Sequence, residues 1–122
     1  MASSIRDVQG PVRALFTDLD GTLTTNGRVE ASTYLALEEL SDKGVSVIIV
    51  TGRPAGWGQA LAALTGAAAV ITENGGVTFV RDGGKFRKHY GVPAASLPEW
   101  RRRMRIAAVD VMQEVPGARM SE

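Results

Sequence analysis

Three short apolar segments, each followed by a polar turn, constrain this chain more than any other feature of its sequence. They are residues 12–18, 45–50 and 67–72. The middle segment is rich in β-branched residues, which favour strands over helices. Residues 30–43 and 54–65 lie between these segments and carry apolar side chains at helical spacing. Strands that alternate with helices predict an α/β fold with a parallel sheet, and a continuous apolar run such as 12–18 predicts a strand covered on both faces.

Turn and helix signals organise the rest of the chain. Asn26-Gly27 is a strong signal for a tight hairpin turn. Residues 77–80 and 85–89 flank a turn with two glycines and predict an antiparallel hairpin. Residues 97–115 predict a long helix, and we expect its apolar face, like that of the helix before the third strand, to pack into a core. The residues on those two faces are Trp57, Leu61, Leu64, Trp100, Met104, Ala108, Val111, Met112 and Val115.

The balance of charge and the scarcity of Cys and His exclude several classes of protein. Fourteen Lys and Arg against thirteen Asp and Glu leave a net charge of +1, which argues against a nucleic-acid-binding or membrane-surface protein. The lack of Cys excludes disulfides, a thiolate nucleophile and Cys-ligated metal sites, and a single His leaves little for His-based sites. No apolar stretch has the length of a signal-peptide core at the start or of a membrane span elsewhere. We therefore expect a cytoplasmic protein without nucleic-acid or membrane partners.

Two carboxylates stand at the end of the first predicted strand. Residues two apart on an extended chain point to the same side, about 6.5–7 Å apart, so Asp18 and Asp20 could act on one substrate. Gly21 allows a sharp turn that brings backbone N–H groups near an anion. The two carboxylates repel each other unless a cation lies between them, and a site of oxygen ligands favours Mg²⁺. The alternative interpretation is that both acids only cap a junction between strand and loop.

Polar residues also follow the second and third strands. The Thr51 hydroxyl, followed by Gly52, can donate a hydrogen bond to a phosphate oxygen, and Arg53 could add a charged fork. Glu73 and Asn74 follow the third strand. Because right-handed crossovers bring the carboxyl ends of parallel strands to one edge, we expect all three segments to converge there. That edge is where open α/β sheets bind ligands.

These three segments, taken together, resemble the motifs of the haloacid dehalogenase superfamily of phosphohydrolases. The motifs are residues 18–23, 51–54 and 73–76, and the likeness spans about residues 12–90. The chain is most similar to the Cof-type branch with a large α/β cap, which includes sucrose-phosphate, trehalose-phosphate and mannosylphosphoglycerate phosphatases. The resemblance implies a Rossmann-like three-layer sandwich with a parallel sheet.

The resemblance also implies a division of the chain. Residues 1–11 are a polar N-terminal lead, residues 12–91 the N-terminal part of the core, and residues 92–122 part of a cap. The family's third motif, with a Lys, and its fourth, with further acids, have no counterpart in this sequence. We therefore expect the chain to be the N-terminal part of a longer protein. Its sheet would lack strands, and the exposed sheet edge would favour self-association.

The roles of individual residues follow from the resemblance alone. Asp18 would be the nucleophile that becomes an aspartyl-phosphate, and Asp20 the acid that protonates the leaving alcohol and then the base that activates water. Mg²⁺ would be bound by the Asp18 carboxylate and the Asp20 backbone carbonyl. The residues that would contact the phosphate or the substrate are Gly21, Thr22, Thr51, Gly52, Arg53 and Asn74.

For the full-length protein, the function expected from these signals is Mg²⁺-dependent hydrolysis of a small phosphorylated metabolite, with a sugar phosphate as the first choice. Activity is not expected of these 122 residues alone, because the Lys and the later acids of the family are absent from them. One alternative is a non-catalytic binding or regulatory module, and another is a phosphotransferase of the phosphomutase type. The arginine run at residues 101–103 could contact an anionic substrate or nucleic acid, but such a run is more often a solvated helix face.

Overall fold

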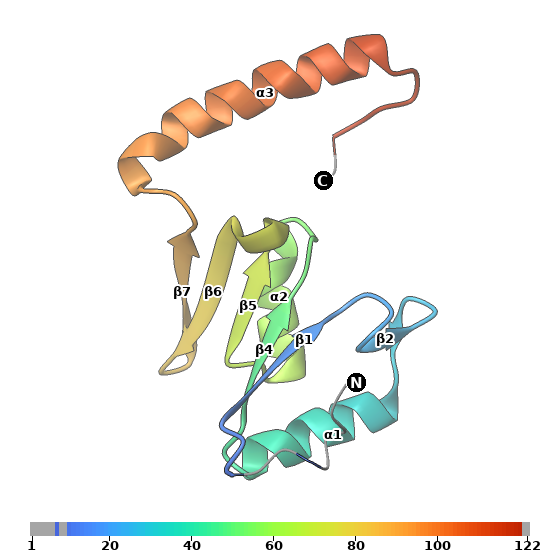
Figure 1. The fold of residues 1–122 in the computed structure, drawn as a ribbon, viewed down its shortest axis with the longest axis vertical. Coiled ribbons are helices and arrows are strands. Elements are labelled where there is room, and N and C mark those ends of the chain that lie inside the picture. The colour runs from blue at the N-terminus through green and yellow to red at the C-terminus, as the bar shows by residue number, and fades with distance from the viewer. Residues whose placement is uncertain (1–6, 8–9, 121–122) are drawn as a thin grey trace.

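The protein is described here by a computed structural model of residue 7 and residues 10–120, and most of the predicted polar lead, residues 1–11, lies outside that part. Its main element is a five-stranded sheet in the order β1-β4-β5-β6-β7 (Figure 1). Strands β1, β4 and β5 run parallel, whereas β6 and β7 extend the sheet in antiparallel pairs. The strands are β1 (Ala14–Asp18), β4 (Ser46–Val50), β5 (Ala69–Thr72), β6 (Val77–Asp82) and β7 (Lys85–Tyr90).

Two helices make the crossovers between the parallel strands. Helix α1 (Ala31–Asp42) joins β1 to β4, and α2 (Gly56–Thr65) joins β4 to β5. Each helix is followed by a glycine with positive φ, Gly44 at 75° and Gly66 at 69°. Only glycine adopts this left-handed conformation readily, so these residues end the helices. The sequence predicted both helices to within two residues of their observed bounds.

Two hairpins complete the core part of the chain. The short strands β2 (Thr24–Thr25) and β3 (Arg28–Val29) pair across a turn in which Asn26 and Gly27 both have positive φ. That conformation is the one tight hairpin turns require. Strands β6 and β7 form the second hairpin, and the sequence predicted both.

The core lies between the sheet and the two crossover helices. Helix α2 approaches the sheet closely at Gly58, where an added Cβ would lie 2.2 Å from the ring of Phe79 on β6. The packing therefore requires glycine at position 58. One cluster joins both helices to β4 and β5, and the predicted Rossmann-like α/β fold is confirmed. The buried residues of that cluster are Leu19, Leu37, Val47, Ile49, Leu61, Ala62, Ala67 and Val70.

Strand β1 is less covered than the sequence predicted. It is an edge strand of the sheet, and its burial alternates between exposed and half-buried residues. The Phe16 side chain is 65% exposed, so the expectation of a strand covered on both faces is wrong. An apolar run shows that both faces of a strand are suited to packing against other elements. It does not show that residues 10–120 contain the elements that would pack there. The predicted self-association at such an edge stays a prediction.

The last helix is the least buried part of the structure. After β7, a short 3₁₀ turn η3 (Ala94–Ser96) leads into α3 (Leu97–Glu114), which crosses above the end of the sheet where β4 and β5 stop (Figure 1). The helix itself was predicted, but none of its residues is buried, and Trp100 is 50% exposed. Trp57 and Leu64 of α2 are also exposed. The expected core role of Trp57, Leu64 and the apolar face of α3 is wrong, because helical spacing identifies a face without identifying a partner.

Within residues 10–120, no helix is both long enough and apolar enough to span a membrane.

Candidate active site

The three polar segments predicted to converge do so at the carboxyl ends of the parallel strands. Asp18, the last residue of β1, is paired with the last residue of β4. Backbone hydrogen bonds join the next two loops, since Asn74 N–H donates to the Thr51 carbonyl at 3.4 Å and Glu73 N–H donates to the Arg53 carbonyl at 3.0 Å. The right-handed crossovers therefore place these loops side by side, as parallel strands require.

The loop after β1 is anchored by one buried side chain. Leu19 is 2% exposed, and its carbonyl accepts the N–H groups of Leu23 and Thr24 at 3.0 Å and, at 3.3 Å, that of Thr22. Gly21 has φ +80°, and its N–H donates to the Thr24 hydroxyl at 3.1 Å. The sharp turn expected at Gly21 is present. Its amide and that of Thr22 are already bonded within the loop, so in this conformation they do not face an anion.

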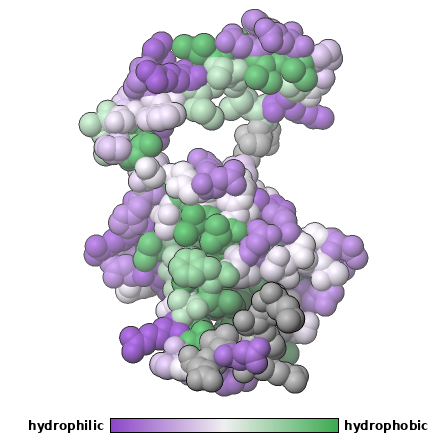
Figure 2. Space-filling model, in the orientation of Figure 1, coloured by the Kyte–Doolittle hydropathy of each residue, from purple (hydrophilic) through white to green (hydrophobic). Residues whose placement is uncertain are grey.

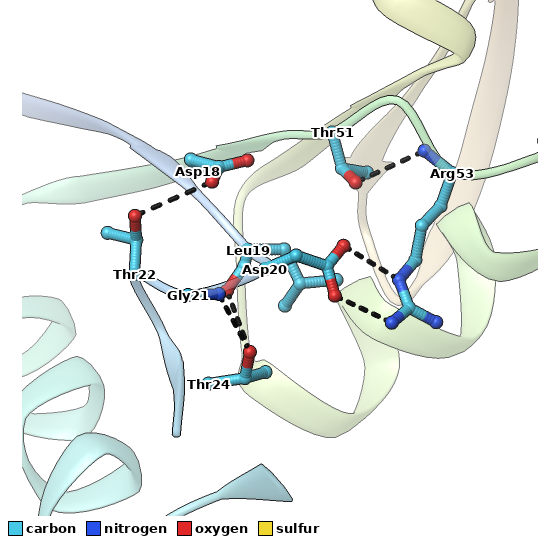
Figure 3. A network of polar contacts seen from close by, with 8 residues as sticks. All are labelled: Asp18, Leu19, Asp20, Gly21, Thr22, Thr24, Thr51 and Arg53. Carbon is cyan, nitrogen blue, oxygen red and sulfur yellow. Dashed lines mark hydrogen bonds and ion pairs between the residues drawn. The ribbon is translucent and has the colours of Figure 1, made fainter. Parts of the chain in front are cut away.

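The two carboxylates of this loop have different partners. In Figure 3 both lie on the side of the strand end that faces Thr51 and Arg53. The Asp18 carboxylate accepts one long hydrogen bond, 3.5 Å from the Thr22 hydroxyl. The Asp20 carboxylate is bound by both ends of the Arg53 guanidinium, at 2.9 Å from Nε and 2.6 Å from Nη2. Asp18 is therefore the carboxylate with open lone pairs.

Arg53 is held from two sides. Besides its bidentate pair with Asp20, the guanidinium stacks 4.2 Å from the ring centroid of Trp57 at the start of α2. The hydrogen bonds from Arg53 hold the pKa of Asp20 below its ordinary value, and those to Asp20 raise the pKa of Arg53. Sequence reasoning missed Trp57 as part of this arrangement. The sequence did offer one signal for this contact: Trp57 follows Arg53 by four residues, a spacing at which side chains of a helical turn meet.

Thr51 and Gly52 present hydrogen-bond donors beside these carboxylates. Thr51 is buried, and its hydroxyl oxygen accepts the Arg53 N–H at 3.2 Å. Neither the Thr51 hydroxyl proton nor the Gly52 N–H meets an acceptor among the described residues. A Cβ on Gly52 would lie 3.2 Å from Asn74 Oδ1, so the Asn74 side chain is directly beside this loop. These groups form a set of donors that can bind an anion without adding charge.

The loop that carries Asn74 has an unusual backbone. Glu73 and Asn74 have φ of 53° and 52°, in the left-handed region that few residues other than glycine adopt. Glu73 Oε1 accepts the Ala55 N–H at 2.9 Å, next to the first turn of α2, where a negative charge is favourable. The carboxylate therefore helps to fix this loop against the Thr51 loop. Sequence analysis gave Glu73 no such role, and a left-handed pair cannot be recognised from residue types alone.

The site offers oxygen ligands for a cation. In the part of the chain that the structure describes, no three His, Cys, Asp or Glu residues cluster in a way that could hold a metal ion. The available oxygen atoms are the Asp18 carboxylate and the main-chain carbonyl of Asp20, which accepts no hydrogen bond from a described residue. Mg²⁺ uses one or two carboxylates and completes its shell with waters and substrate phosphate, so these residues fit it.

A family model for haloacid dehalogenase-like hydrolases matches residues 15–99 of the chain. That range includes all three motifs and every candidate site residue.

Solved structures of such proteins are similar to the chain. A haloacid dehalogenase-like hydrolase from B. subtilis has a TM-score of 0.62 at 23% identity, over 84% of this chain and 34% of that one. The sugar phosphatase BT4131, of subclass IIB, has a TM-score of 0.50 at 29% identity, over 80% and 38%. A structure from a study of a trigonal-bipyramidal intermediate in a phosphoryl-transfer superfamily has a TM-score of 0.52 at 32% identity, over 68% and 33%. The chain thus spans about a third of the length of the structures it matches.

Proposed function

The chain belongs to the haloacid dehalogenase-like hydrolase family, and from this premise we propose that it carries the nucleophile and the phosphate-binding loops of a phosphomonoester hydrolase. The observation that carries the proposal is the environment of Asp18. Among the described residues, its exposed carboxylate accepts only a long hydrogen bond, and the Thr51 hydroxyl proton and Gly52 N–H of the neighbouring loop meet no acceptor. A nucleophile needs free lone pairs, and a transferring phosphoryl group needs donors that offset its charge.

The chemistry would proceed in two displacements at phosphorus. Asp18 attacks, the ester P–O bond breaks, and the departing alkoxide takes a proton from Asp20. Water then attacks the phosphoryl group on Asp18, Asp20 takes the proton of that water, and the bond between phosphorus and the Asp18 oxygen breaks to release phosphate. The Thr51 hydroxyl and the Gly52 N–H would donate to the phosphoryl oxygens in both steps.

The Asp20–Arg53 pair must open for this to happen. While Arg53 is bound, the pKa of Asp20 is lowered, so the group is held as a carboxylate that carries no proton to donate. A dianionic phosphate ester competes with Asp20 for the guanidinium, because Arg binds phosphate oxygens in the same bidentate way. Transfer of Arg53 to the phosphate would remove the cause of the lowered pKa of Asp20. The arrival of substrate would thus prepare the acid.

Mg²⁺ is part of the proposal. The Asp18 carboxylate and the Asp20 carbonyl would hold the ion. It would supply positive charge that reduces repulsion between an anionic nucleophile and an anionic ester. The natural substrate would be a small phosphorylated metabolite, with a sugar phosphate favoured by the likeness to a sugar phosphatase.

Two alternatives use the same residues and differ in the product. A phosphomutase-type transferase would pass the phosphoryl group from Asp18 to a second sugar hydroxyl, and a non-catalytic module would bind phosphate without transferring it. Release of inorganic phosphate separates the hydrolase from both.

The test is phosphate release from p-nitrophenyl phosphate by the full-length protein in the presence of Mg²⁺. Asp18→Asn is expected to lower the rate at least about a thousandfold, because the nucleophile is lost. Asp42→Asn is the matched control, since Asp42 is an exposed acid at the end of α1, which leads into the start of β4, whereas the site loops follow the carboxyl ends of the strands. Removal of Mg²⁺ by a chelator is expected to stop release. Turnover that survives Asp18→Asn would contradict the assignment of the nucleophile.

A further inference from the structure

A hollow of about 700 Å³ lies between α3 and the core, next to the site described above. Figure 2 shows the open space between α3 and the rest of the molecule. Its walls come from the loop after β5, the end of β7, the linker that follows it and one side of α3. The lining residues include Ala55, Glu73, Lys88, Tyr90, Trp100, Arg101 and Arg105.

The arginines of α3 fall into two sets. Arg102 and Arg103 both bind Glu99, at distances of 2.9 to 3.0 Å. Arg101 and Arg105 line the hollow, and neither meets a carboxylate within residues 10–120. Residues four apart on a helix lie on the same side, so the two unpaired guanidinium groups are neighbours. The arginines of α3 therefore have one side on which Arg102 and Arg103 share the Glu99 carboxylate and another on which Arg101 and Arg105 have no carboxylate partner within residues 10–120.

The opposite wall adds a third cation and aromatic surface. Lys88 Nζ lies 5.0 Å from the ring centroid of Tyr90, and both residues line the hollow together with Trp100. Glu73, the one carboxylate that lines the hollow within residues 10–120, accepts the Ala55 N–H at 2.9 Å. Among the described lining residues, three cations against one carboxylate give a positive charge, and the aromatic walls suit an apolar or flat group.

The hollow adjoins the loops of the candidate active site. Ala55 and Glu73 line it, and they belong to the same two loops that carry Thr51 and Asn74. Glu73 N–H donates to the carbonyl of Arg53, two residues before Ala55. A molecule whose phosphate lies at the strand ends can therefore extend its remainder between α3 and the core.

We propose that this hollow binds the organic part of a phosphomonoester that carries a second anionic group, and that Arg101 and Arg105 recognise that second group. The inference rests on the proposed function, because it places the phosphoryl end of the ligand at Asp18. Charge complementarity argues for the class of ligand: an anion that reaches two unpaired guanidinium groups forms charge-assisted hydrogen bonds without breaking an existing ion pair.

The test compares two ligands that share one phosphonate end and cannot be hydrolysed. Binding of benzylphosphonate and of its 4-carboxy derivative to the chain is measured by calorimetry with Mg²⁺. The carboxylate is expected to tighten binding about tenfold or more. The double variant Arg101→Gln, Arg105→Gln is expected to reduce this preference to about one. The matched double variant Arg102→Gln, Arg103→Gln, on the same helix, is expected to keep it.

Two results would overturn the inference alone: equal binding of the two ligands, or a preference that survives loss of Arg101 and Arg105. No binding of either ligand would overturn it together with the proposed phosphate site. The ratio between the ligands cancels their common phosphonate end. A failure at the hollow is therefore distinguishable from a failure of the proposed function, which is tested by the dependence of phosphate release on Asp18. All four substitutions are at exposed helix positions, so circular dichroism is expected to show unchanged folding.

Discussion

The loops at the carboxyl end of the parallel strands and the helix α3 lie on the same side of the molecule, but they are held in different ways. Each loop continues a strand, and hydrogen bonds or a buried residue such as Leu19 fix it against its neighbours. Helix α3 has no buried residue and presents its apolar side chains to solvent. The site loops are therefore held in place by the core. Helix α3 contributes charged and apolar surface but little to the stability of the fold.

The largest expected effect comes from making the same substitution, valine to alanine, in both regions. Val70 on β5 is fully buried and Val111 on α3 is 52% exposed. Val70→Ala is expected to lower the free energy of unfolding by about 2–3 kcal/mol, through lost burial and a cavity. Val111→Ala is expected to change it by less than about 0.5 kcal/mol. Urea denaturation measures both, and equal losses would show that α3 is packed as firmly as the core.

A second pair of substitutions tests the close packing of α2 against the sheet. Gly58→Ala is expected to destabilise the protein by about 1–3 kcal/mol, because the added Cβ meets the Phe79 ring. Gly56→Ala is the matched control in the same helix. Its Cβ has nothing within 4 Å, and alanine favours helix, so the variant is expected to be neutral or slightly more stable. Thermal unfolding distinguishes them, and a stable Gly58→Ala variant would contradict the packing.

The core could be predicted from the sequence because its signals are local. The β-branched run at residues 45–50, the turn at Asn26-Gly27 and the glycine at position 44 each limit the backbone to few conformations. The convergence of Asp18 and Thr51 followed from the handedness of crossovers. What could not be predicted depended on partners distant in the sequence.

The Arg53–Asp20 pair, the stacking of Trp57 and the left-handed backbone of Glu73 depend on how loops meet in space. Residue types alone do not predict which loops contact one another. In the same way, the apolar spacing of α3 was correctly interpreted as a helix and wrongly interpreted as core, since no local signal tells whether another element covers a face.

A smaller effect concerns the titration of the site. In the folded protein the pKa of Asp20 is below its ordinary value because of Arg53. The pair is therefore intact above the ordinary carboxyl range, and is lost when the pH falls through the lowered pKa. Arg53→Gln is expected to raise the pKa of Asp20 back toward the ordinary value of an aspartate, because the guanidinium that lowers it is lost; carbon NMR of the carboxyl group measures the change. Lys43→Gln, which removes the partner of Glu39, is the control and is expected to leave the pKa of Asp20 unchanged. If the pKa of Asp20 is the same in Arg53→Gln as in the wild type, the Asp20–Arg53 ion pair does not persist in solution.

The smallest expected effect is that of the ring that stacks on Arg53. Trp57→Ala is expected to raise the pKa of Asp20 by only part of the change seen in Arg53→Gln, because the guanidinium loses its support but not its charge. Trp57→Phe keeps an aromatic face and is expected to restore much of the wild-type pKa. Trp100→Ala, on α3, changes the other tryptophan and is expected to have no effect. A pKa that moves equally in Trp57→Ala and Trp100→Ala would contradict the positioning role of Trp57.

The central claim is that the Asp18 carboxylate accepts a phosphoryl group beside the donors of Thr51 and Gly52. Beryllofluoride imitates a phosphoryl group on a carboxylate, and fluorine NMR detects its bound form directly. With Mg²⁺ present, we predict a bound signal for the wild-type chain and for Asp42→Asn, and none for Asp18→Asn. No bound signal in the wild type, or an undiminished signal in Asp18→Asn, would contradict the account.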